Sequence, residues 1–298
     1  MAAPSRQPPA KRAAAKQAPA KKTGAKRTPA KKAAARKLAA KTAAATTTAA
    51  KPSPAPEAVV EAEGPPPVLE LVGVRAAYGR IEVLHGVDLR VPQGSVVALL
   101  GPNGGGKTTT LKVASGQMVP TAGCLHISGR HVNGVAPDAL ARIGVCTIPE
   151  GRGIFPNLTV RENLRMVTFG GVKHHEVEEK AFTRFPRLGE RRNQLAGTMS
   201  GGEQQMLAMA RGLAVDPTLL FLDELSMGLA PLIVEELYEI VAQIARTGVS
   251  ILVVEQFART VLGVADLAAI MLHGRVTAVG PPDEIAPELE AAYLGASH

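Results

Sequence analysis

The sequence has 298 residues, of which 46% are hydrophobic, so it is long enough for one or two domains with proper cores. Its net charge of +8 is uneven, because residues 1–51 hold 14 of the 34 lysines and arginines and no acidic residue, which leaves 20 basic and 26 acidic side chains in the rest. No run of 18 apolar residues occurs and the first residues lack the apolar core of a secretory signal, so we expect neither a membrane-spanning segment nor export.

Residues 1–51 repeat alanine, lysine and proline, with Leu38 as the only large apolar residue after Met1. Such a segment cannot bury enough apolar surface to offset the entropy of ordering, so it is expected to be disordered. Three interpretations stay open: it binds anionic lipid, it binds nucleic acid by releasing counterions, or it is a solvated extension without a selective partner. A proline-rich linker follows at residues 52–67.

The folded part is expected to run from Val68 to residue 298. Short β-branched runs from 68 to 100 predict antiparallel strands that lead into one buried strand, "SVVALLG", and residues 124–132 predict a hairpin. Helical apolar spacing occurs at 159–169 and 176–185, with Thr159 and Glu162 as a capping box, inside a predicted helical part at about 152–212. Beyond Ser200, helices alternate with apolar strands, which predicts a mainly parallel sheet covered on both faces.

The cysteines and histidines give weak signals. Cys124 and Cys146 lie in apolar alternation and are expected to be reduced core residues. Cys124 together with His126 and His131 raises the alternative of a metal site, but no second ligand pair accompanies them. The adjacent His174 and His175 are interpreted as polar residues of a solvated loop.

The segment "GPNGGGKT" follows a predicted strand, precedes a predicted helix and fits the phosphate-binding pattern G-x-x-x-x-G-K-[ST]. Its glycines let backbone N–H groups point at phosphate oxygens, Lys107 places a positive charge at the β- and γ-phosphates, and the Thr108 hydroxyl can bind Mg²⁺. The nucleotide is therefore expected to contact Gly101, Pro102, Asn103, Gly104, Gly105, Gly106, Lys107, Thr108 and Thr109.

The apolar strand "TLLFL" ends in two acids, Asp223 and Glu224. A buried strand has little reason to end in paired carboxylates unless a cation binds there, so Asp223 is expected to hold Mg²⁺. Glu224 is then placed to orient or deprotonate the attacking water. The alternative, two solvated loop acids, is weakened by the phosphate-binding loop upstream.

A second glycine turn opens a helix at "SGGEQQ", where Ser200, Gly201, Gly202 and Glu203 offer N–H donors, a hydroxyl and the positive end of a helix dipole. One nucleotide does not obviously fill both phosphate sites. The economical arrangement is a dimer in which this turn closes on the ATP held by the opposite subunit. The alternative is an ordinary N-capped helix, which explains Ser200 and Glu203 but not the two glycines.

These three motifs, with "SGGEQQ" 93 residues after Lys107 and "FLDE" just beyond it, resemble the ATP-binding subunits of ABC transporters from Val68 to the end of the chain. The resemblance implies an α/β fold: a P-loop NTPase core with an antiparallel β subdomain and a helical subdomain, here preceded by the basic tail. It also implies ATP and Mg²⁺ as cofactors.

Further roles follow from the resemblance. Tyr78 matches the aromatic residue that stacks on adenine, with a half-buried strand-end tyrosine as the alternative. Glu150 stands where most relatives have the glutamine that senses Mg²⁺ and contacts the permease, and it is assigned to the nucleotide and the metal. Gln256 stands where most have the histidine that contacts the γ-phosphate, and it joins Glu224 and Lys107 as a catalytic candidate.

The patterns "PEGR", "LDE-S-x-GLAP" and "VEQ" are similar to one subgroup, the second ATPase subunit of branched-chain amino acid importers. Ala230 replaces the wider family's usual Asp in the loop before the next helix, and Leu225 replaces the family's usual proline after Glu224. Both departures bear on the coupling between two ATP sites. Gln256 can donate a hydrogen bond but carries no imidazolium charge, so weaker transition-state stabilisation is expected there.

The resemblance implies an ATPase at the cytoplasmic face of the membrane that powers solute import by ATP-driven closure and reopening of a dimer. Its implied partners are a second ATPase subunit in a hetero- or homodimer, transmembrane permease subunits near residues 150–164, with Phe155 as an apolar contact or else a core residue, and indirectly an extracytoplasmic solute-binding protein. Branched-chain amino acids are the implied cargo, with amides or urea as alternatives. A soluble ABC-type ATPase that acts on nucleic acid or ribosomes through the tail is the second hypothesis.

Overall fold

The computed structural model describes residues 66–151, 153–167 and 173–295, except for the side chains of 293–295. The chain divides into two units, residues 1–61 and 62–298, and all described residues belong to the second. The tail predicted to be disordered and most of the predicted linker lie outside the described residues. Within the described part, no helix is both long and apolar enough to cross a membrane.

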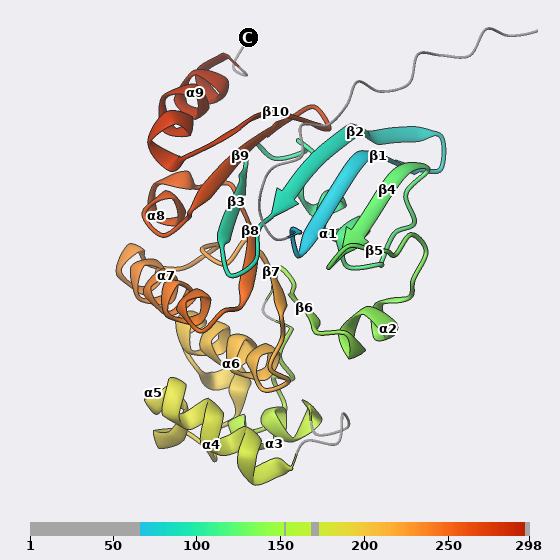
Figure 1. The fold of residues 1–298 in the computed structure, drawn as a ribbon. Helices are drawn as coiled ribbons and strands as arrows, with labels where there is room; N and C mark the ends of the chain where they lie inside the picture. The colour runs from blue at the N-terminus through green and yellow to red at the C-terminus, as the bar shows by residue number, and fades with distance from the viewer. Residues whose placement is uncertain (1–65, 152, 168–172, 296–298) are drawn as a thin grey trace, which may run out of the picture. The chain divides into compact units, whose positions relative to one another are not determined.

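The centre of the fold is a six-stranded sheet with the strand order β10-β9-β3-β8-β7-β6 (Figure 1). Its strands are β3 (Val96–Leu100), β6 (Val145–Ile148), β7 (Leu219–Asp223), β8 (Ser250–Glu255), β9 (Leu267–Leu272) and β10 (Arg275–Gly280). All neighbours pair in parallel except β10, which runs antiparallel to β9. The prediction of a mainly parallel sheet is therefore confirmed.

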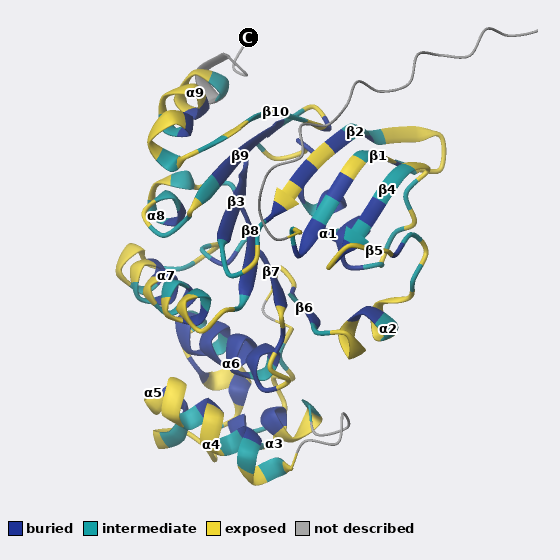
Figure 2. Cartoon of the chain, viewed as in Figure 1, coloured by how far each residue is buried: buried dark blue, intermediate teal, exposed yellow. Residues whose placement is uncertain are grey.

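The central strands are apolar at nearly every position because both faces of the sheet are covered. Along β3, Val97 and Leu99 belong to one hydrophobic core, whereas Ala98 and Leu100 belong to the other. The same alternation runs through β7, β8 and β9. Figure 2 shows β3, β7 and β8 as buried along their whole length, and β9 as buried except at its two ends.

One core lies between this sheet and an antiparallel sheet of order β2-β1-β4-β5. Its strands are β1 (Leu69–Tyr78), β2 (Ile81–Val91), β4 (Ala122–Ile127) and β5 (Arg130–His131). Helices α1 (Lys107–Ala114) and α2 (Pro137–Arg142) contribute apolar residues to the same core. The predicted hairpin is β4-β5, and the predicted antiparallel strands are β1 and β2.

The other core lies under the remaining helices: α6 (Gly201–Leu213), α7 (Pro231–Arg246), α8 (Ala258–Leu262) and α9 (Pro282–Gly295). The helical part adds α3 (Val160–Arg165), α4 (His174–Arg184), α5 (Pro186–Glu190) and a short 3₁₀ turn at Ala196–Thr198. Prolines occupy the first turns of α2, α5 and α7, where an N–H is unpaired anyway.

Two local predictions in the helical part change. The helix predicted to reach residue 169 is α3, which ends at Arg165, and residues 168–172 lie outside the described residues. The solvated loop predicted at His174 and His175 is wrong, because both residues open α4. His174 Nε2 accepts a hydrogen bond from Arg165 Nε at 2.9 Å, which ties the first turn of α4 to α3.

A buried amide organises the loop before α3, whose predicted capping box between Thr159 and Glu162 is present. Asn163 is fully buried, accepts a hydrogen bond from the Phe155 backbone N–H at 2.8 Å, and donates to the carbonyls of Phe155, Leu158 and Thr159. One side chain thus pairs the Phe155 N–H and adds a second donor to carbonyls that already accept from backbone N–H groups.

Replacing this amide should destabilise the fold. In Asn163→Ala the buried Phe155 N–H loses its hydrogen-bond partner, the three carbonyls keep only their backbone donors, and a cavity is left, so we expect the free energy of unfolding to fall by about 2 to 4 kcal/mol. Urea unfolding followed by circular dichroism measures the change. Asn193→Ala, at an exposed position, should shift it by about 0.5 kcal/mol or less; equal losses in both variants would contradict the assignment.

Candidate functional site

The glycine-rich loop between β3 and α1 has a shape that side chains would block. A Cβ atom on Gly101 would lie 2.2 Å from the Met271 carbonyl oxygen, and one on Gly106 would lie 2.9 Å from Met271 Cε. Gly104 has a φ of +78° and faces open space. The loop therefore packs tightly against β9 on one side and leaves its other side free for close approach of a ligand to the backbone.

Lys107, the first residue of α1, is only 4% exposed. Its ammonium group donates hydrogen bonds to the carbonyls of Gly101 at 2.7 Å and Pro102 at 3.0 Å, so it lies inside the curve of the loop. Burial lowers the pKa of Lys107, while the carboxylates of Glu224 and Asp223 act to raise it. These effects show that the lysine and the two acids at the end of β7 share one electrostatic environment.

Asp223 is the last residue of β7 and is 7% exposed. Its Oδ1 atom is buried and has no hydrogen-bond partner among the described residues. Burial raises the pKa of Asp223 to about 6, with further raising by Glu224 and Glu150. An unpartnered buried carboxylate oxygen is energetically unfavourable in a fold unless a cation or donor completes it.

Glu224 follows directly and is half-buried. Its φ of +47° lies in the left-handed region, while its N–H donates to the Val254 carbonyl of β8 at 2.9 Å. Burial raises the pKa of Glu224, and the nearby Glu150 raises it further. Glu150 is exposed in the loop after β6, and Gln256 is half-buried directly after β8, so adjacent parallel strands deliver these side chains to one edge of the sheet.

Tyr78 ends β1 with 47% of its surface exposed. A hydrogen bond with Thr109 lowers the pKa of Tyr78, and Lys112 of α1 lowers it further. The Lys112 ammonium lies 3.3 Å from the tyrosine hydroxyl and 5.6 Å from the ring centroid. The antiparallel sheet thus presents an aromatic ring beside the helix that begins in the glycine-rich loop.

The second glycine turn forms an N-capped helix start. Ser200 Oγ accepts from the Glu203 N–H at 3.4 Å, and Glu203 accepts from the Ser200 N–H at 2.9 Å, which completes a capping box. Arg191 pairs with the other Glu203 oxygen at 2.7 Å. A Cβ on Gly202 would lie 2.3 Å from Ile233 Cγ2 of α7, so close helix packing explains this glycine, which the capping interpretation left unexplained.

The comparisons with known proteins agree with this geometry. Residues 84–226 match the family described as ABC transporter. The chain is 42% identical over 226 residues to the high-affinity branched-chain amino acid transport ATP-binding protein BraG of Pseudomonas aeruginosa, covering 74% of this chain and 97% of that protein. It is 33% identical over 222 residues to the probable branched-chain amino acid transport ATP-binding protein LivF of Archaeoglobus fulgidus, covering 73% and 94%.

The chain belongs to the ATP-binding proteins of ABC transporters. It is accordingly an ATPase of this family, and the family prediction from its motifs is confirmed. A solved ATP-binding subunit of an ABC transporter is 29% identical, has a TM-score of 0.67, and covers 78% of this chain and all of that one. An ATP-binding cassette in its ADP conformation, 24% identical with a TM-score of 0.70, covers 77% of this chain and 99% of that one and shows the same fold.

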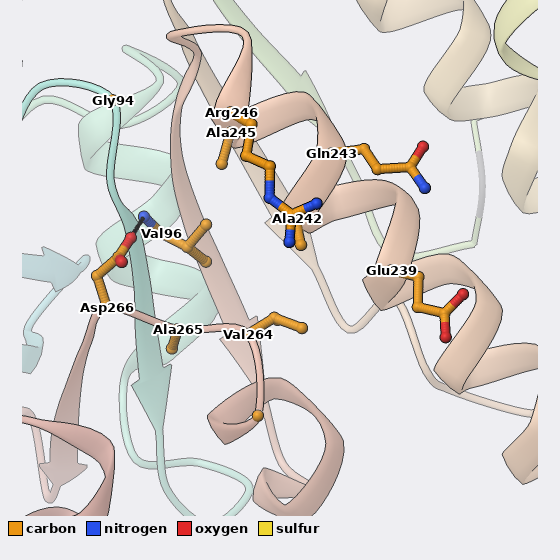
Figure 3. A pocket seen from close by; sticks show the side chains of 11 residues that line it. Gly94, Val96, Glu239, Ala242, Gln243, Ala245, Arg246, Val264, Ala265 and Asp266 are labelled. Atoms are coloured by element: carbon orange, nitrogen blue, oxygen red, sulfur yellow. Dashed lines mark hydrogen bonds between the residues drawn. The ribbon is translucent and has the colours of Figure 1, made fainter.

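A large cavity of this ABC ATPase lies away from the glycine-rich loop. It encloses about 630 Å³ and is lined by Gly94, Val96, Arg246, Asp266 and neighbouring residues (Figure 3). Gly94 and Val96 lie at the start of β3, Asp266 precedes β9 and Arg246 ends α7, whereas the loop follows the opposite end of β3. The Asp266 carboxylate in it accepts a hydrogen bond from the Val96 N–H at 2.8 Å, which ties two strand starts together.

The alternative metal site at Cys124, His126 and His131 gains no support. The two imidazole rings lie 5.3 Å apart in an edge contact, and His126 Nδ1 lies 3.9 Å from a Glu70 oxygen. Within the described ranges, no group of three histidine, cysteine or acidic residues lies close enough to hold a metal ion. Both cysteines are free and partly buried rather than fully in the core.

Sequence reasoning missed several residues that shape the site of this ABC ATPase. Glu255, at the end of β8, is 1% exposed and contacts the loop after Glu224. Arg211 of α6 donates to the Gly153 carbonyl and lies 4.8 Å from the Phe155 ring centroid. An acidic residue inside the apolar run "SILVVE" was the available signal for Glu255, whereas the Arg211 contacts leave no local pattern.

The pKa of Asp223 predicts a pH-dependent gain in stability for Asp223→Asn. Between about pH 4 and pH 6 the Asp223 carboxyl group keeps its proton in the folded chain but loses it in the unfolded chain. The destabilisation of the folded chain by this group therefore grows through this range and reaches its full size above about pH 6. Without nucleotide or Mg²⁺, the variant should be more stable by about 1 to 3 kcal/mol at about pH 7.5.

Urea unfolding at about pH 4 and pH 7.5 measures this difference, which should shrink toward zero at the lower pH. Glu288→Gln, an exposed acid on α9, serves as the control and should change stability little at either pH. A gain for Asp223→Asn that is the same at both pH values would contradict the buried-carboxylate explanation.

Proposed function

We propose that this ABC ATPase powers the import of branched-chain amino acids. The observation that carries the proposal is the 42% identity over 97% of a branched-chain amino acid transport ATP-binding protein, together with the similarity to a second such protein at 33%. The motifs "PEGR" and "VEQ" belong to the same pattern. The cargo assignment rests on these relatives, because no residue of the ATP site would touch the transported solute.

The proposed hydrolysis uses groups gathered at the carboxyl ends of the strands. The backbone of the glycine-rich loop and Lys107 would bind the β- and γ-phosphates, with Tyr78 stacked on the adenine. Glu224 would orient the attacking water and accept its proton, for which a raised pKa is suited because a base works best near the ambient pH. Gln256 would donate a hydrogen bond to the γ-phosphate.

The residues also fit Mg²⁺. The unpartnered Oδ1 of Asp223 and the exposed carboxylate of Glu150, together with the Thr108 hydroxyl at the start of α1, would hold the ion. When bound, the ion would neutralise charge on the β- and γ-phosphate oxygens.

A dimer would complete the site. In it, the N–H groups of Gly201 and Gly202 and the hydroxyl of Ser200 would close on the ATP held by the opposite subunit, either a copy of this chain or a second ATPase. The capping box orients Ser200 at the positive end of α6, a 13-residue helix. Closure on ATP and reopening after hydrolysis would then supply the motion for transport.

The same proposal places the chain at the cytoplasmic face of the membrane beside permease subunits, with a solute-binding protein on the other side. Phe155 is 41% exposed, which favours its assignment as an apolar permease contact over a core position. Nearby, a cavity of about 620 Å³ lies along the edge strand β6 and is lined by Leu140, Val145, Cys146, Val167 and Val215, among others.

The departures from the family pattern have defined positions. Leu225 is buried beside Glu224 in the hydrophobic core, and Ala230 is the N-cap residue of α7 without a side-chain cap. An Asp at position 230 would cap α7, so its replacement by alanine removes a polar contact between this loop and its surroundings. We therefore propose weaker coupling between the two ATP sites than in relatives that have the acid.

Cells that lack this chain should take up less leucine, isoleucine or valine. We expect labelled uptake to recover with the intact chain but not with Glu224→Gln, because loss of a catalytic base should lower ATP hydrolysis by about 10²-fold to 10⁴-fold. ATP binding by the variant should be unchanged. Restored uptake of a different solute, such as an amide or urea, would overturn the cargo assignment and leave the ATPase role intact.

The proposed contact of Ser200 with a γ-phosphate is testable with two variants that can both cap α6. Ser200→Asn should keep stability within about 1 kcal/mol of the intact chain. Ser200→Asp should be less stable, because its carboxylate replaces a hydroxyl that donates to Glu203 at 2.9 Å, so activities are compared at a temperature where both variants are folded. Only the aspartate places a negative charge at the proposed phosphate site. Its ATPase activity should be at least about 10-fold below that of the asparagine variant; equal activities would show that Ser200 does not face a phosphate.

A further inference from the structure

A buried carboxyl group joins three elements behind the ATP site. Glu255, the last residue of β8, is 1% exposed. Its Oε1 accepts hydrogen bonds from the Ser226 backbone N–H at 2.9 Å and from the Tyr238 hydroxyl at 2.7 Å, and its Oε2 accepts from the Ser226 hydroxyl at 2.9 Å. The donors come from the loop after β7 and from helix α7, which lie beside β8 in Figure 1.

Burying the Glu255 carboxyl group in an apolar core is energetically unfavourable unless hydrogen bonds satisfy its oxygen atoms. Tyr238 is itself 1% exposed, and burial together with Glu255 raises the pKa of Tyr238 well above its usual range, so its hydroxyl keeps the proton that it donates. The cluster of Glu255, Ser226 and Tyr238, called the Glu255 cluster below, is therefore a fully satisfied polar network in the core.

The position of this cluster gives it a consequence for the ATP site. Ser226 lies two residues after Glu224, and Gln256 is the residue directly after Glu255. The Glu224 N–H also donates to the Val254 carbonyl of β8, so the backbone around Glu224 is tied to β8 on both sides. Glu224, with a φ of +47°, therefore depends on contacts outside its own strand to hold its backbone conformation.

We infer that Glu255 is a positioning residue, whose buried carboxyl group fixes the loop carrying Glu224 against the strand end carrying Gln256. This inference rests on the roles proposed above for Glu224 and Gln256. The hydrogen bonds of Glu255 are independent of those roles. Glu255 is 1% exposed, so it would act on the ATP site through the loop and the strand end that it joins. Its effect is to keep the proposed base and the proposed γ-phosphate donor in register, where a displacement of about 1 Å can lower a rate by about 10²-fold.

Two substitutions separate the effect of the Glu255 hydrogen bonds from the effect of its side-chain volume. In Glu255→Gln the side chain keeps its length, the amide oxygen can still accept from Tyr238 and the Ser226 N–H, and the amide nitrogen can donate to the Ser226 hydroxyl. In Glu255→Leu the volume is similar but no acceptor remains. The glutamine variant of the full chain should retain kcat within about 3-fold, while the leucine variant should lose at least about 10-fold with KM for ATP within about 2-fold.

A second readout does not depend on activity. The Ser226 amide is hydrogen-bonded to Glu255, so hydrogen exchange in a peptide that begins at or before residue 223 and extends to 230 should be faster in Glu255→Leu and near normal in Glu255→Gln. Ile244→Ala is the matched control, because it removes a buried side chain from the same helix as Tyr238. Measured at a temperature where all variants are folded, the control should lower the melting temperature without changing kcat or exchange in that peptide.

The outcomes separate this inference from the proposed catalytic roles. If Glu255→Leu keeps full kcat, or if Glu255→Gln loses as much as Glu255→Leu, the positioning role is wrong. If Ile244→Ala lowers kcat as much as Glu255→Leu, the effect is general destabilisation and the inference is overturned. Glu224→Gln, assayed beside them, tests the catalytic assignment alone: retained hydrolysis in that variant contradicts the role of Glu224 while the exchange data still report on the Glu255 cluster.

Discussion

The burial of β3, β7 and β8 on both faces sets the electrostatics of the ATP site. Because β7 and β8 are closed off from water on either side, the acids that end them, Asp223 and Glu255, are buried. Burial and the neighbouring carboxylates raise the pKa of Asp223 and of Glu224. Lys107 lies at the same edge of the sheet, at the start of α1. It is a buried cation whose pKa the carboxylates of Glu224 and Asp223 act to raise. This edge of the sheet carries both a positive charge and negative charges, so it can bind a triphosphate, which is negative, together with a divalent cation.

Local motifs made much of this predictable. The glycine-rich loop, the acids after β7 and the two capping boxes each depend on residues within a few positions of one another, so the sequence pattern alone specifies their chemistry. The parallel sheet was predictable for a similar reason, since continuous apolar runs such as "SILVV" suit strands covered on both faces. The comparisons support the family that these motifs indicated.

Contacts between distant segments were not predictable. Glu255 meets Ser226 across 29 residues, and Arg211 meets Gly153 across 58, distances over which no periodicity links the partners. The Gly-Gly of the second turn shows a different limit. Phosphate binding was the reason inferred for both glycines, yet Gly202 also leaves room for Ile233 of α7, a packing demand that only the helix arrangement reveals. His174 was misplaced in a loop although Glu178 lies one helical turn further along α4; its other partner, Arg165, belongs to α3.

The left-handed backbone at Glu224 has a consequence for how this protein can change over evolutionary time. A glycine or asparagine would adopt a φ of +47° with less strain than glutamate does, so the position is one where the most stable residue and the proposed reactive residue differ. Variants selected only for heat resistance would drift away from the acid there. At position 224 the residue that would give the most stable fold therefore differs from the residue that the proposed catalysis requires.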